Sequence, residues 1–97
     1  METVNSREDI LNIARKIIVG ERNQTYGSPE DSFSLIAKYW STYLDREVTS
    51  TDVANMMILL KVARNTGGSG SIDSYIDIAG YAACGGETYI AKQKTEE

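Results

Sequence analysis

Two carboxylates one helical turn apart are the side chains of this chain best placed to do chemistry. They lie in the stretch DSYIDIAGYAACGGE, which runs from Asp73 to Glu87. At 100° per residue, Asp73, Asp77 and Glu87 fall on one stripe about 80° wide. Glu87 follows Asp73 by about 21 Å along the helix axis, so only Asp73 and Asp77 can share one ion.

Carboxylates that share a helix face need compensation, because bringing like charges together costs free energy. One solution is a divalent cation such as Mg²⁺, held by Asp73, Asp77 and further oxygen ligands. The other is an ion-pair network with Lys61 and Arg64, which end the preceding helix. A short loop joins the two helices, so they are expected to be antiparallel neighbours. Spacing alone leaves both alternatives open.

A second candidate cluster lies in the loop that contains Arg22, Gln24, Tyr26 and Gly27. An arginine can hold a phosphate through two parallel hydrogen bonds, and a tyrosine can stack on a nucleobase. The alternative is an ordinary turn with one packed tyrosine.

Composition limits the classes of function. The 97 residues carry a net charge of −4, and lysine and arginine are scattered, which argues against binding to duplex nucleic acid. The chain has no histidine and one cysteine, Cys84, so histidine-dependent catalysis and an internal disulfide are excluded. We expect a single domain over residues 1–97 that does not enter a membrane and lies in the cytoplasm.

Periodicity predicts an all-α fold. Helices are expected over about residues 7–22, 29–45, 50–64 and 72–92, with start signals at Ser6, Ser28-Pro29 and Thr49-x-x-Asp52. The third helix is apolar nearly all round, which predicts a buried central element. The glycines of the last helix indicate close approach of another helix or a ligand.

The second helix carries Phe33 and Trp40 on one face, which predicts core or an oligomer interface. So short a chain is marginal as a monomer, so we expect a homo-oligomer.

Three segments carry a resemblance to known proteins. They are the tyrosine–glycine loop from Arg22 onwards, the Lys61-x-x-Arg64 end of the third helix, and the Asp73/Asp77 pair followed by Gly80-Tyr81. Together they resemble a family of small phage and prophage proteins whose name states only that their function is unknown. That family is similar, at a distance, to the MazG-like all-α nucleotide pyrophosphohydrolases.

The resemblance implies a four-helix MazG-like bundle completed by oligomerisation, with an ancestral Mg²⁺-dependent cleavage of nucleoside triphosphates. It implies that Arg22, Tyr26, Lys61, Arg64 and Tyr81 bind the ligand, and that Asp73 and Asp77 bind the metal. The Glu-x-x-Glu and Glu-x-x-Asp helices of the hydrolases are absent from this sequence.

We therefore expect a protein that binds a nucleotide or a nucleotide-derived signal, such as a cyclic messenger. Residual pyrophosphohydrolase activity is a further expectation, with no catalytic residue assigned. The alternative is a non-catalytic protein-interaction or inhibitor module that uses the Phe33/Trp40 face.

Overall fold

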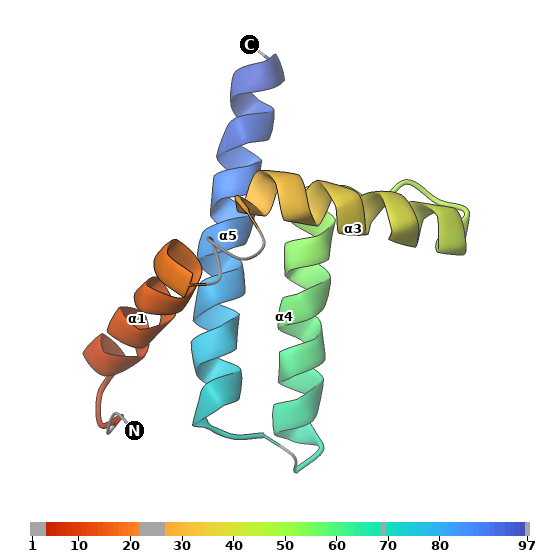
Figure 1. The fold of residues 1–97 in the computed structure, drawn as a ribbon. Coiled ribbons are helices and arrows are strands. Elements are labelled where there is room, and N and C mark those ends of the chain that lie inside the picture. Colours follow the sequence, from red (N-terminus) through yellow and green to blue (C-terminus); the bar gives the residue numbers. More distant parts are fainter. Residues whose placement is uncertain (1–3, 22–26, 69, 97) are drawn as a thin grey trace.

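The computed structural model describes residues 4–21, 27–68 and 70–96. These residues form helices and no strand (Figure 1), which confirms the all-α class. The elements are α1 (Arg7–Arg15), η1 (Lys16–Glu21), α3 (Pro29–Leu44), α4 (Ser50–Thr66) and α5 (Ile72–Glu96).

The predicted helix starts lie where the sequence placed them, because capping depends on local chemistry. The amide of Asp9 donates to the Ser6 hydroxyl, and the amide of Asp31 donates to the Ser28 hydroxyl. Thr49 caps α4 and forms a reciprocal capping box with Asp52. The Thr49 amide donates to the Asp52 carboxylate, and the Asp52 amide donates to the Thr49 hydroxyl. These bonds satisfy amides that have no partner inside the helix.

The first helix departs from the sequence expectation. In place of one α-helix to about residue 22, the α-helical winding ends at Arg15 and continues as the π-helical segment η1. Gly20 has φ −96° and ψ −105°, outside the helical region.

The helices are arranged around α5 (Figure 1). Helices α4 and α5 lie side by side and antiparallel, α1 packs on another side of α5, and α3 crosses the end of the α4–α5 pair. The last turns of α5 extend past α3. The described helices therefore form an antiparallel pair with two crossing helices, and a MazG-like bundle remains a prediction.

The core is small and lies where α3, α4 and α5 meet. Its buried members are Phe33, Ala37, Val53 and Ala54, with the partly buried side chains of Ile36, Trp40, Val48, Met57, Tyr81 and Cys84 packed against them.

The prediction of a buried central third helix is wrong for this chain. Helix α4 buries Val53 and Ala54 but exposes the side chains of Met56, Leu59, Leu60 and Val62. Helix α5, which contacts α1, η1, α3 and α4, is the central element.

Two glycines of α5 explain how closely its neighbours approach. A Cβ added at Gly85 would lie 2.9 Å from the Ala54 Cβ of α4, and one added at Gly80 would lie 3.2 Å from Ile18 Cγ2 of η1. Both distances are shorter than an ordinary van der Waals contact. The close approach predicted from these glycines is thus seen at Gly80 and Gly85.

Candidate functional site

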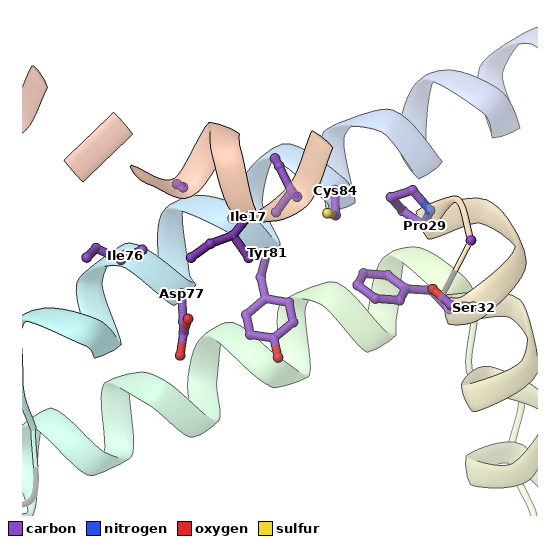
Figure 2. A pocket seen from close by; sticks show the side chains of 12 residues that line it. Ile17, Pro29, Ser32, Ile76, Asp77, Tyr81 and Cys84 are labelled. Carbon is purple, nitrogen blue, oxygen red and sulfur yellow. The ribbon is translucent and has the colours of Figure 1, made fainter. Parts of the chain in front are cut away.

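A cleft lies between η1, the start of α3 and one side of α5 (Figure 2). The cleft is partly open, and its volume is about 40 Å³. A second, more open hollow of about 430 Å³ adjoins it and shares the lining residues Ile18, Pro29 and Cys84. The cleft alone is smaller than a typical small-molecule site, so a ligand of that size would extend into the open hollow.

The walls of the cleft are mostly apolar, with a polar edge on α5. Ile17, Ile18 and Phe33 contribute apolar walls, and Pro29 and Cys84 line the end shared with the second hollow. Asp77 and Tyr81, one turn apart on α5, turn their polar ends in the same direction, towards α4 (Figure 2). Few polar groups in an apolar surround are typical of sites that orient a small ligand.

The carboxylate of Asp77 has a cationic partner. Lys61 Nζ on α4 lies 2.9 Å from Asp77 Oδ2. The Lys61 side chain is 14% exposed and that of Asp77 37%. The pair links α4 to α5 beside the cleft, as the pairing alternative in the sequence predicts.

Asp73 and Arg64 lie farther from the cleft edge. Asp73 is exposed in the first turn of α5, and Arg64 is exposed near the end of α4. Neither lines the cleft. Of the two predicted cations and two predicted carboxylates, the structure thus brings Lys61 and Asp77 into contact.

Tyr81 combines packing with a position on the cleft. Its ring centroid lies 6.3 Å from that of Phe33, with the ring planes tilted by 36°. Tilted aromatic pairs at this distance are favourable. The packing holds the Tyr81 ring in place, so that its hydroxyl can serve the polar edge.

The described donors are a poor match for a resident Mg²⁺. Within residues 4–21, 27–68 and 70–96, no three histidine, cysteine, aspartate or glutamate side chains gather closely enough to hold one. Mg²⁺ requires near-octahedral oxygen coordination, and at Asp77 it would compete with the Lys61 ammonium. Mg²⁺ binding by Asp73 and Asp77 remains a prediction.

Two predicted ligand-binding residues, Arg22 and Tyr26, lie outside the described residues. Their roles remain predictions.

The structure also corrects the predicted protein-interaction face. Phe33 is only 6% exposed and belongs to the core, and Trp40 packs partly buried against it. The large apolar side chains that α3 does expose are Leu35, Tyr39, Tyr43 and Leu44.

Sequence reasoning missed the η1 wall of the cleft. Ile17 and Ile18 belong to a periodic apolar stripe, which indicates burial but does not reveal a gap beside it. The available signal was Gly20, since a glycine near the end of a helical pattern marks a change in backbone winding.

Comparison with known protein families shows to which family the chain belongs. Residues 9–89 match the family described as Domain of unknown function (DUF6378). The chain belongs to this family. The match covers α3 and α4 entirely, together with most of α1 and α5.

Two phage proteins are similar to this chain. The Gene 55 protein of Mycobacterium phage D29 is 49% identical over 77 residues, which cover 79% of this chain and 51% of that protein. The Gene 55 protein of Mycobacterium phage L5 is 46% identical over 74 residues, covering 75% and 47% respectively. The chain thus spans about half the length of these curated relatives. No solved structure is significantly similar to it.

The family and both relatives support the coarser part of the resemblance, to small phage proteins of unknown function. Among the described helices, none combines the length and apolar character needed to span a bilayer.

Proposed function

We propose that this protein binds a nucleotide or nucleotide-derived ligand in the cleft between η1 and α5. The observation that carries the proposal is that Asp77 and Tyr81 line one edge of a cleft whose other walls are mostly apolar. The MazG-like ancestry and a homo-oligomeric state belong to the proposal as well.

The chemistry of the cleft suits the two ends of such a ligand. A planar base would lie against Ile17 and Ile18, since aliphatic walls exclude water from its faces. Asp77 can accept hydrogen bonds from base N–H groups, and Tyr81 can donate or accept one. Lys61 offers a positive charge beside this edge for a phosphate.

Ligand binding and the Lys61–Asp77 ion pair would be linked. A phosphate that recruits the Lys61 ammonium would draw it from Asp77. That carboxylate could then help to hold Mg²⁺, which would supply positive charge to the phosphate. Arg64 and Asp73, both exposed near this end of the α4–α5 pair, would extend the charged edge. Binding is the proposed activity, and hydrolysis is a separate question for assay.

Calorimetric titration with linear and cyclic nucleotides, each with and without Mg²⁺, tests the proposal. At least one ligand should bind, and binding should weaken about tenfold or more in Asp77→Asn or Tyr81→Phe, because each loses a directed polar contact. Asp45→Asn is the matched control, since it makes the same carboxylate-to-amide change at the exposed end of α3. It should bind like the parent protein.

Two results would refute this assignment. If no nucleotide bound, the proposed function would be wrong. If both Asp77→Asn and Tyr81→Phe kept full affinity, the ligand would bind elsewhere than in this cleft. Pyrophosphate release with Mg²⁺ measures residual hydrolysis separately. Release that persists unchanged in Asp77→Asn would exclude this carboxylate from catalysis.

A further inference from the structure

An uncharged stripe runs along the outer face of α5. It consists of positions spaced alternately by three and four residues, and we call it the α5 seam. Its members are Ile72, Tyr75, Ala79, Ala82, Gly86, Tyr89 and Gln93. At 100° per residue they fall within about 100° of one another, and spacing of this kind is typical of a helix–helix interface.

Most of the α5 seam is exposed in the single chain, and Ala79 is partly buried. Tyr75 is 56% exposed and Tyr89 54% exposed. Ala82 and Gly86 between them are also exposed, and a Cβ added at Gly86 would meet nothing within 4 Å. A seam without charge, with two large aromatic side chains open to water, is unusual for a helix face that stays solvated.

Helix α4 adds to the same face. The α4–α5 contact joins Ala54 to Gly85 and Lys61 to Asp77. Because the two helices are antiparallel, the helical positions of Leu59 and Val62 lie on the same side of the pair as the α5 seam. Both are exposed. Helices α1 and α3 lie on the opposite side, so this face is separate from the proposed ligand cleft.

We infer that this face binds a second copy of the same chain, with the two α5 helices antiparallel and crossing near Ala82. The order of side-chain sizes favours this occupant. Tyr75 and Tyr89 each lie seven residues from Ala82 and flank the small residues of the seam, so its central part has nearly the same order of side-chain sizes from either end, whereas Ile72 and Gln93 at its two ends differ. A two-fold interface requires such self-complementarity, because each residue must meet its counterpart in reverse order.

The antiparallel arrangement has a defined register. Tyr75 of each copy lies near Tyr89 of the other, and the two copies of Ala82 lie opposite each other on the two-fold axis. The small residues at the crossing allow the helices to approach closely. The antiparallel orientation also aligns the two helix dipoles favourably.

The available area lies at the lower limit of what a stable dimer needs. Helices α4 and α5 together present a face on the order of 600 Å², for helix diameters of about 10 Å and a rise of 1.5 Å per residue. A stable interface buries about 800 Å² per partner, part of it from a polar rim. The turns of α5 that extend past α3 (Figure 1) would gain a neighbour along their length.

Sedimentation of matched variants tests the inference. The parent chain should have twice the mass of one chain, and Ala82→Glu should raise the dimer dissociation constant about 100-fold or more, because it brings two carboxylates together on the axis. Leu11→Glu is the control: it places the same charge at an exposed position of α1. It should leave the dimer intact.

Crosslinking checks the register. An Ala82→Cys variant should form a disulfide-linked dimer on oxidation, since opposed Cα atoms closer than about 7 Å can be bridged. A mixture of Tyr75→Cys and Tyr89→Cys chains should crosslink between the two variants in preference to either alone. The native Cys84 points to the cleft side of α5 and should not link two chains (Figure 2).

A monomeric parent chain would overturn the inference, as would a dimer that Ala82→Glu leaves unchanged. If Tyr75→Cys and Tyr89→Cys each crosslinked with themselves instead of with each other, the helices would be parallel and the proposed register would be wrong. Nucleotide titration of the monomeric Ala82→Glu variant distinguishes this failure from failure of the cleft, because the two lie on opposite faces.

Discussion

Gly85 and Gly86 offer a sharp test of how α4 packs on α5. They are neighbours in the same helix, so replacing either by alanine removes the same backbone flexibility and gains about 0.5–1 kcal/mol of helix propensity. At Gly85 the new methyl would lie 2.9 Å from the Ala54 Cβ, whose residue is fully buried. At Gly86 it would meet nothing within 4 Å of the single chain.

We therefore expect opposite signs for one chemical change. Overpacking a filled helix interface costs about 1–3 kcal/mol, which outweighs the propensity gain, so Gly85→Ala should lower the free energy of unfolding by about 1–2 kcal/mol. Gly86→Ala should raise it by about 0.5–1 kcal/mol at protein concentrations at which the chain is monomeric. For a chain of this size, each kcal/mol corresponds to a melting-temperature change of about 4–8 °C.

Urea and thermal unfolding at several protein concentrations measure both effects and separate folding from association. A double variant that moves the methyl group from Ala54 of α4 to position 85 of α5 gives a further test of this contact. Ala54→Gly removes it from α4, so Ala54→Gly combined with Gly85→Ala should be more stable than the sum of the two single changes predicts, by about 1 kcal/mol or more. A stabilised Gly85→Ala variant, or strict additivity in the double variant, would show that the two helices do not meet at these residues.

Three further predictions concern single contacts. Asp45→Gly should stabilise the chain by about 0.5–1 kcal/mol in thermal unfolding, because Asp45 ends α3 at φ 54°, a conformation that costs glycine nothing; a loss of stability would contradict this left-handed end. Thr49→Ala should cost about 1 kcal/mol by removing the α4 cap, and Thr49→Ser should cost clearly less. Thr88→Val should cost about 1–2 kcal/mol by denaturant titration, because the buried Thr88 hydroxyl, 2.8 Å from the Gly85 carbonyl and 3.0 Å from the Thr51 hydroxyl, is lost; an unchanged midpoint would contradict these bonds.

Features encoded over a few residues could be predicted from the sequence. The caps at Ser6, Ser28 and Thr49 depend on one side chain and one amide three residues away, so they need no knowledge of the tertiary fold. The contact between Lys61 and Asp77 required one further assumption, that a short loop makes α4 and α5 antiparallel neighbours. That assumption holds in the structure.

The cleft could not be predicted in this way, because three separate elements define it. The hydrophobic pattern of Ile17 and Ile18 indicates that these side chains avoid water, but it does not indicate which surface covers them. Their placement depends on the change of winding in η1 and on Gly80, which allows Ile18 to approach α5. Such information lies in the packing of elements distant in sequence.

The wrong prediction for α4 has a related physical cause. An apolar helix face indicates that the face avoids water, but the pattern does not distinguish burial within one chain from burial against another. Helix α4 was expected to be surrounded by its own chain, yet Leu59 and Val62 are exposed beside the α5 seam. Under the dimer inference the second copy covers Leu59 and Val62, which accounts for that part of the apolar pattern of α4.

The face of α5 that packs on its own chain and the face that is exposed therefore differ in amino-acid composition. The covered face contains Gly80 and Gly85, where a Cβ would meet a neighbouring helix of the same chain, and Asp77, whose charge Lys61 balances. The bare face contains Gly86, where an added Cβ would meet no neighbouring element of the chain within 4 Å, so intrachain packing does not account for a residue that weakens a helix. A glycine that no intrachain contact requires is explained if the second copy approaches there, and the stability of Gly86→Ala at rising protein concentration tests that explanation directly.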